Sequence, residues 1–130
     1  MQRPSAIESA RRHLNQWTHR VGTLPILILM PHSRCNARCI MCAIWKANAN
    51  AQTLSSDELR PHIESLAQMG VRRVVLSGGE PLLHENLWTL CKLIEEILGA
   101  KITLLSTGLT IEKHAESIAK HIDELILSLD

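Results

Sequence analysis

The sequence has no phenylalanine and no tyrosine, so three tryptophans are the only aromatic residues available to a core in a chain of 130 residues. It also lacks an excess of one charge, since 14 Lys and Arg stand against 13 Asp and Glu for a formal net charge of +1. This balance gives no electrostatic reason to expect nucleic acid or an anionic membrane as a partner. An apolar share of 45% is nevertheless typical of a globular domain with its own core.

Long apolar runs are missing as well. The longest run covers residues 24–30 and contains Pro25, which is far short of the roughly 20 residues that a membrane-spanning helix needs. The first five residues, Met-Gln-Arg-Pro-Ser, lack the apolar stretch of a secretory signal. We therefore expect a cytoplasmic protein with no membrane as partner.

Apolar periodicity predicts one helix, then strand and helix three times, then a last strand. The helices are expected at residues 1–21, 55–70, 85–98 and 110–121, and the strands at 26–30, 71–76, 101–105 and 125–129. Residues 31–53 are expected to form a loop. Strand 26–30 is apolar throughout, which predicts burial on both faces. The alternation predicts an α/β fold with a parallel sheet, in which residues 1–21 are an N-terminal helical extension and residues 22–130 the main unit.

The unusual residues of this chain all follow predicted strands. Cysteines follow the first strand, Gly78-Gly79-Glu80-Pro81 follows the second, and Ser106-Thr107-Gly108 follows the third, while Asp130 ends the fourth. Ligands of parallel α/β proteins bind at the carboxyl ends of the strands. The sequence therefore predicts one site at that edge of the sheet.

The cysteines themselves admit two kinds of metal site. Cys35, Cys39 and Cys42 fall within eight residues, and clustered thiols in a cytosolic chain are more often metal ligands than disulfides. Tetrahedral zinc would need a fourth ligand, either His32 or the distant Cys91, which lies on an apolar helix face. A [4Fe–4S] cluster held by three thiolates would keep one iron open.

The cysteine spacing Cys35-x3-Cys39-x2-Cys42, together with Gly78-Gly79-Glu80-Pro81 after the second strand, resembles the radical S-adenosylmethionine (radical SAM) superfamily. The stretch 35–46 is similar to the branch that contains the molybdenum-cofactor GTP-cyclising enzyme and peptide-modifying maturases. The resemblance covers residues 24–130. It implies a partial TIM-type barrel of about six βα units, so we expect the four strands here to be the N-terminal part of a larger, truncated barrel.

The resemblance also implies the cofactors. Cys35, Cys39 and Cys42 would bind three irons of a [4Fe–4S] cluster, and S-adenosylmethionine (SAM) would chelate the fourth. The reduced cluster would cleave SAM to a 5′-deoxyadenosyl radical that abstracts a hydrogen from an unidentified substrate, with an electron donor such as flavodoxin or ferredoxin. Because the cofactor carries the hard step, no catalytic residue of the protein is implied.

The same resemblance assigns a SAM-binding set. Backbone and carboxylate groups of the Gly-Gly-Glu segment would meet the SAM ammonium. Two members depart from the family pattern: Met41 stands where an aromatic residue often lies against the adenine, and Thr107 where an asparagine often stands. The SAM-binding set is Met41, Gly78, Gly79, Glu80, Ser106, Thr107 and Ser128.

Simpler interpretations stand beside the enzyme. The cysteines could stabilise a non-catalytic zinc or cluster module, or the chain could be an inactive truncated product. Gly78-Gly79-Glu80-Pro81 alone is also typical of a turn and a helix start. We expect packing roles for Trp45 and Trp88. We expect solvated side chains for His32, for His84, and for Lys46 and the Asn/Ala run that follows it.

Overall fold

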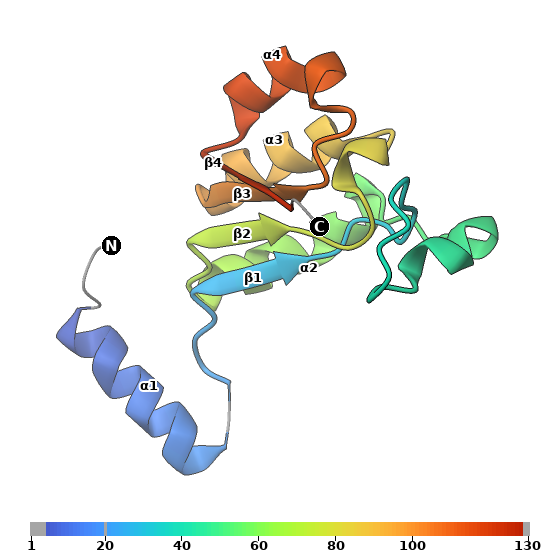
Figure 1. Cartoon of the computed structure of the whole chain (residues 1–130). Helices are drawn as coiled ribbons and strands as arrows, with labels where there is room; N and C mark the ends of the chain where they lie inside the picture. The colour runs from blue at the N-terminus through green and yellow to red at the C-terminus, as the bar shows by residue number, and fades with distance from the viewer. Residues whose placement is uncertain (1–4, 20, 129–130) are drawn as a thin grey trace.

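The structure, a computed structural model, describes residues 5–19 and 21–128 and confirms the predicted order of elements (Figure 1). Two short 3-10 helices, η1 and η2, add to this order within connections that follow β1 and β2. The elements are α1 (Ala6–Thr18), β1 (Ile26–Leu29), η1 (Ile44–Asn50), α2 (Ser56–Gln68), β2 (Arg73–Leu76), η2 (Pro81–Leu83), α3 (Leu87–Leu98), β3 (Lys101–Ser106), α4 (Ile111–His121) and β4 (Glu124–Leu127).

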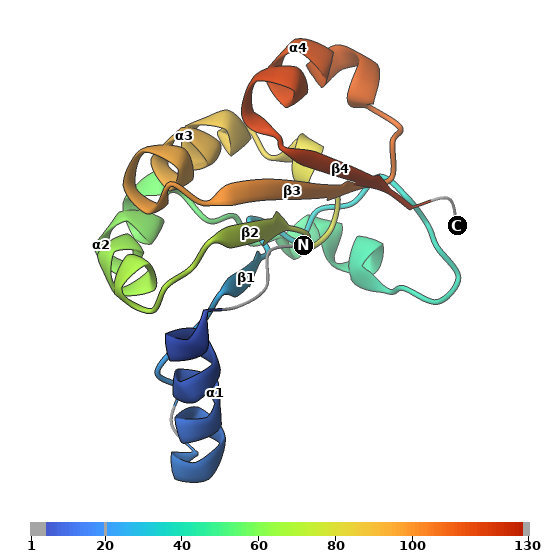
Figure 2. The ribbon, with the colours of Figure 1, turned by 90° about the vertical axis from the view of Figure 1, so that its left-hand side faces the viewer.

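The sheet is parallel throughout, and its strand order β1-β2-β3-β4 follows the chain (Figure 2). Leu27 pairs with Val74, and Val74 with Ile102, so the strand ends that carry the unusual residues come level at one edge. Each strand returns to its neighbour through a helix, as parallel pairing requires. The predicted parallel α/β architecture is confirmed.

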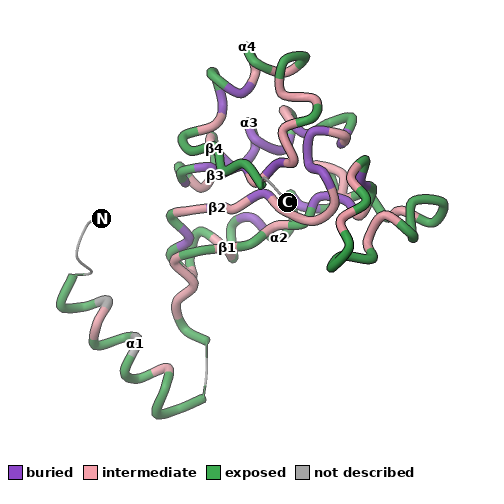
Figure 3. The backbone as a smooth tube through the Cα atoms, viewed as in Figure 1, coloured by how far each residue is buried: buried purple, intermediate pink, exposed green. Residues whose placement is uncertain are grey.

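The core lies between the sheet and the helices. Val74, Leu76, Ile102 and Leu104 are completely buried in the two central strands. Helix α3 supplies the main apolar surface opposite them, and α2 and α4 flank it. Figure 3 shows the buried residues concentrated in β2, β3 and α3. This burial fixes the central strands, and with them the two loops that leave their carboxyl ends.

The predicted burial of the first strand on both faces is wrong. Leu27 and Leu29 pack against the core, but Ile26 and Ile28 are 53% and 63% exposed. Ile26 and Ile28 point to the opposite face of the sheet from Leu27 and Leu29, and no described helix packs on that face at β1. An all-apolar strand predicts two covered faces, and here the second face is open.

Helix α1 extends away from the sheet (Figure 1). Its apolar residues Ile7, Leu14 and Trp17 are more than half exposed, so the predicted helix forms without packing its apolar side on the described core. Asn15 ties the helix to the following turn by accepting a hydrogen bond from the Gly22 amide at 3.0 Å. Within residues 5–19 and 21–128, no helix combines the length and the apolar character needed to span a membrane.

Candidate functional site at the carboxyl edge of the sheet

The cysteines lie in a loop whose two ends are joined. The Leu54 amide donates to the Pro31 carbonyl at 2.7 Å, and the Ser33 amide donates to Gln52 at 3.2 Å. His32 and Thr53 form an isolated antiparallel bridge between these two contacts. Residues 31–33 and 52–54 therefore form a closed neck. The cysteine loop, residues 34–51, projects from this neck beside the carboxyl end of β1.

The double glycine brings β2 against the start of that loop. The Gly79 amide donates to the His32 carbonyl at 3.2 Å, and the Glu80 amide donates to the Arg34 carbonyl at 2.8 Å. A Cβ atom on Gly79 would lie 2.0 Å from the Arg34 carbonyl oxygen, and one on Gly78 2.6 Å from that of His32. Gly78 also has a φ of 111°, which favours glycine. Glycine is therefore required here for close contact with the cysteine loop itself.

Glu80 connects the second strand end to the third. Its carboxylate is fully buried, and its Oε2 accepts from the amide and the hydroxyl of Thr107, both at 2.7 Å. Its Oε1 accepts from the Ser106 hydroxyl at 2.9 Å and from the Leu82 amide at 3.2 Å. An ionised carboxylate has about four acceptor positions, so these donors occupy them. The predicted SAM-facing residues Ser106 and Thr107 thus direct their hydroxyls at Glu80.

The simpler interpretation of the Gly-Gly-Glu-Pro segment also holds locally. Glu80 is the N-cap of η2, and Pro81 occupies the first turn of that helix. The start of η2 is compatible with the contacts that Glu80 makes at the ends of β1 and β3. The helix cap uses only the Leu82 amide among the donors to the Glu80 carboxylate.

The structure places the cysteines along one loop but at different depths. Cys35 is buried, Cys39 is half-buried and Cys42 is exposed. The Cys42 amide donates to the Cys39 carbonyl at 3.3 Å, which puts these two on a single turn. Among the described residues, no three His, Cys, Asp or Glu side chains converge closely enough to hold one metal ion.

The donor set suits a cluster better than a closed zinc site, because three thiols leave a zinc ion one ligand short. Zinc draws four ligands to one centre at about 2.0–2.3 Å. A [4Fe–4S] cluster takes each thiolate at a separate iron, so the sulfurs stand further apart. The number and chemistry of the donors, three thiols on one loop, suit the cluster.

Neither proposed fourth zinc ligand joins the cysteines. His32 is buried, and its Nε2 donates to the Glu80 carbonyl at 2.7 Å. Cys91 is fully buried in α3, where burial raises the pKa of its thiol to about 12. The expected solvated state of His32 is therefore wrong, because its ring holds the second strand end against the cysteine loop.

A cavity of about 1020 Å³ opens beside the cysteines. Cys39 lines it together with Met41, whose side chain is fully exposed, and with Leu109 from the loop after β3. Two strand ends thus contribute to one cavity at the predicted edge. The other lining residues are Asn36, Ala37, Arg38 and Ile40.

The fourth strand end meets the third through backbone. The Ser128 amide donates to the Ser106 carbonyl at 3.0 Å, and Ser128 is exposed. Asp130, expected at the same strand end, lies outside the described residues. Of the predicted set, Gly78, Gly79, Glu80, Ser106 and Thr107 form one connected group, Cys39 and Met41 share the cavity, and Ser128 adjoins Ser106.

His84 is a further buried histidine near this edge, and its expected solvation is also wrong. Its Nε2 donates to the Leu54 carbonyl at 2.9 Å, and its Nδ1 accepts from the Asn86 amide at 3.0 Å. Burial, reinforced by the neighbouring His32 ring, lowers the pKa of His84 below its ordinary value of 6.5. Both contacts match the neutral ring, so His84 ties η2 to the neck of the cysteine loop.

Acidification is expected to destabilise this attachment. Because the folded pKa of His84 is lowered, the unfolded chain binds more protons around and below pH 6.5. The contribution of His84 to the free energy of unfolding is complete above that pH and is lost as the pH falls through the folded pKa. Urea unfolding between neutral and mildly acidic pH should show a smaller pH slope for His84→Leu. The exposed His62 provides the control, because His62→Leu should leave the pH slope unchanged. If His84→Leu also left the slope unchanged, the assignment would be contradicted.

Sequence reasoning missed the contacts of Asn48 inside the cysteine loop, whereas it expected a packing role for Trp45. Asn48, expected to be solvated, accepts from the Cys35 amide at 3.0 Å and donates to the Cys35 carbonyl at 2.8 Å. Trp45 packs under the Arg38 guanidinium, 5.5 Å from the ring centre. Its indole N–H is buried and has no hydrogen-bond partner within the described part of the chain. No local pattern marks Asn48, because its partner lies thirteen residues away.

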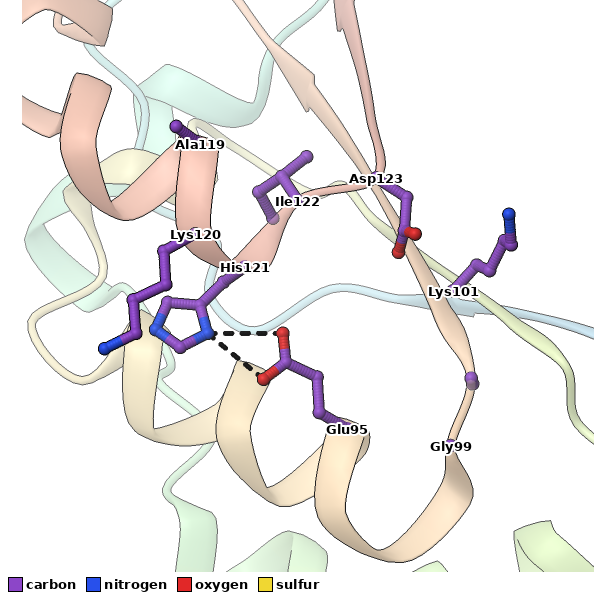
Figure 4. Close-up of a pocket in the computed structure, with 9 residues that line it drawn as sticks. Glu95, Gly99, Lys101, Ala119, Lys120, His121, Ile122 and Asp123 are labelled. Carbon is purple, nitrogen blue, oxygen red and sulfur yellow. Dashed lines mark hydrogen bonds and ion pairs between the residues drawn. The ribbon is translucent and has the colours of Figure 1, made fainter.

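A second pocket of about 530 Å³ lies at the opposite, amino edge of the sheet (Figure 4). His121 of α4 pairs there with Glu95 of α3 at 3.1 Å, and Asp123 accepts from the Ile102 amide at 2.8 Å. These polar groups hold neighbouring elements together. None of the site residues predicted from the sequence lines this pocket.

The fold and the carboxyl-edge site define a class: parallel α/β proteins with a cysteine loop after the first strand of the sheet. Comparison with known proteins narrows this class to one family. A sequence model of the radical SAM superfamily matches residues 29–130, and the chain belongs to that superfamily.

Individual relatives agree with this assignment. The GTP 3′,8-cyclase of Limosilactobacillus fermentum is 35% identical over 102 residues, which are 75% of this chain and 31% of that protein. The crystal structure of BtrN in complex with AdoMet and 2-DOIA is 20% identical with a TM-score of 0.68, covering 81% of this chain and 45% of BtrN. Streptococcus suis SuiB bound to precursor peptide SuiA is 25% identical with a TM-score of 0.68, covering 95% of this chain and 29% of SuiB.

These matches confirm both the family resemblance and the predicted partial-barrel fold. The chain spans about a third of the length of the curated relatives it matches. Its four strands correspond to part of the fold of the longer chains.

Proposed function

We propose that the protein is a radical SAM enzyme or the N-terminal part of one. With a [4Fe–4S] cluster and SAM bound, the site would supply a 5′-deoxyadenosyl radical for hydrogen abstraction from a substrate. The observation that carries this proposal is the placement of three cysteines on one loop that is hydrogen-bonded to the Gly-Gly-Glu segment and borders a cavity.

The residues of the chain would divide the work between them. Cys35, Cys39 and Cys42 would hold the cluster, and the backbone around Gly78 and Gly79 would receive the SAM ammonium. Glu80 would act at the same edge, where its buried carboxylate fixes the loop after β3 through Thr107. Met41 and Ser128 would complete the SAM site, Met41 from the wall of the cavity and Ser128 from the fourth strand end.

The similarity supports the shared SAM chemistry and leaves the substrate unassigned. Among the relatives are a GTP 3′,8-cyclase and SuiB, which was crystallised with a precursor peptide. The GTP in the first name and the precursor peptide in the second structure are chemically different molecules. We propose a one-electron donor such as flavodoxin or ferredoxin as a partner, because SAM cleavage at the cluster consumes an electron.

Anaerobic reconstitution with iron and sulfide tests the proposal. We expect a brown protein with the visible absorption of a [4Fe–4S] cluster, a reduced EPR signal that SAM perturbs, and 5′-deoxyadenosine after reduction with dithionite. A colourless protein that retains zinc through reconstitution would overturn the proposal and favour the zinc module.

A further inference from the structure

We propose that η1, the short helix inside the cysteine loop, is a brace that holds the loop ready for the cluster, and that Asn48 is its positioning residue. This inference rests on the proposed function, since it assigns a role toward the same cluster. It gives a structural role to Asn48, which we expected to be solvated as part of a run of alternating alanine and asparagine.

Asn48 binds the backbone of Cys35 on both sides. Its Oδ1 accepts from the Cys35 amide at 3.0 Å, and its Nδ2 donates to the Cys35 carbonyl at 2.8 Å. The side-chain amide thus pairs with the main chain as a neighbouring strand would, which fixes the position and the rotation of this residue. Cys35 is the buried cysteine of the three, only 8% exposed.

Trp45 attaches the same helix at a second point. The Arg38 guanidinium lies 5.5 Å from the Trp45 ring centre, and the Lys46 ammonium lies 5.6 Å from it. Arg38 directly precedes Cys39 in the sequence. Helix η1 therefore contacts Cys35 itself and the residue beside Cys39, while Cys42 leads into the helix through Ala43.

Because the neck closes the loop at its base, the contacts of η1 set the position of the cysteines within the loop. Residues 31–33 and 52–54 are paired, so the loop between them is closed at its base. Inside it, η1 occupies the returning half and the cysteines the outgoing half. Outer contacts that orient metal ligands commonly change metal affinity by about 10–100-fold when they are removed. Loss of the Asn48 amide is expected to have an effect of this size on cluster loading.

Thiol reactivity in the cluster-free protein tests the brace without any cluster. We expect rapid alkylation of exposed Cys42, slower alkylation of Cys35, and none of Cys91, whose pKa is raised to about 12. Asn48→Ala removes both hydrogen bonds to the Cys35 backbone and should increase the alkylation rate of Cys35 by about tenfold, as expected for the loss of two hydrogen bonds. Asn50→Ala, in the same helix, is the matched control and should leave the rate unchanged. Continued protection of Cys91 reports that each variant is folded.

Iron loading provides the second measurement. Asn48→Ala should need higher iron and sulfide to reach the same visible absorption, and its reduced EPR signal should broaden, whereas Asn50→Ala should match the wild type.

An unchanged alkylation rate of Cys35 in Asn48→Ala overturns the brace. Equal loading and equal spectra of Asn48→Ala and wild type overturn its role toward the cluster while the proposed function stands. If the wild type itself takes up no cluster, the proposed function fails and the inference about the cluster fails with it, although the thiol rates still report the brace.

Discussion

Replacing any one of Cys35, Cys39 or Cys42 with alanine is expected to abolish cluster binding and SAM cleavage together. Each thiolate would bind a separate iron, so no neighbouring group can replace a missing one. Iron content, visible absorption and 5′-deoxyadenosine production should fall to background in each of the three variants.

Cys91→Ala is the matched control for these variants. Cys91 is fully buried in the core and lies on α3, away from the cysteine loop. Its truncation should cost about 1 kcal/mol of stability through the small cavity it leaves. Iron content and SAM cleavage should remain at the wild-type level. A Cys91→Ala variant that loses iron, or a Cys39→Ala variant that keeps its cluster and its activity, would show that the ligand set is wrong.

The sequence identified the edge of the sheet where the site lies because that information is local. The succession of strand-like and helix-like apolar patterns located the strands, and the unusual residues follow those strands directly. The start of α2 is likewise local, because Ser55 and Glu58 form a capping box whose two hydrogen bonds are both present in the structure. Family motifs then identified the cysteines, whose spacing is itself a local property of the chain.

The rest depended on contacts between distant segments. Asn48 bonds a residue thirteen positions earlier, and His32 bonds the Glu80 carbonyl forty-eight positions later. The exposure of Ile26 and Ile28 depends on what covers an edge strand, which the apolar character of that strand cannot reveal. The sequence likewise could not show that the double glycine fits against the Arg34 carbonyl. Side-chain roles at this site are therefore set by how three loops meet.

Among the residues of this site, Glu80 is expected to be the one whose replacement most destabilises the contacts between the three loops. Its carboxylate accepts from Ser106, Thr107 and Leu82, and its carbonyl accepts from His32. Glu80→Ala would leave several of these donors buried without a partner. Since a buried donor left without an acceptor costs about 1–3 kcal/mol, we expect a loss of at least about 2 kcal/mol in the free energy of unfolding, measured by urea titration.

Glu80→Gln separates the loss of charge from the loss of shape. One carboxylate oxygen becomes an NH₂ group facing donors from Ser106 or Thr107, so we expect destabilisation by about 1.5–3 kcal/mol and weaker SAM binding. Combining it with Thr107→Val removes one opposing hydroxyl, and the two effects should couple by about 0.5–3 kcal/mol, because the residues are in contact.

A SAM analogue without the amino group distinguishes a positioning role of Glu80 from direct binding of the SAM ammonium. If Glu80 acts by holding the loop after β3, Glu80→Gln should weaken binding of SAM and of the analogue by the same factor. A deficit seen only with SAM would mean that the carboxylate turns from Thr107 to bind the ammonium directly.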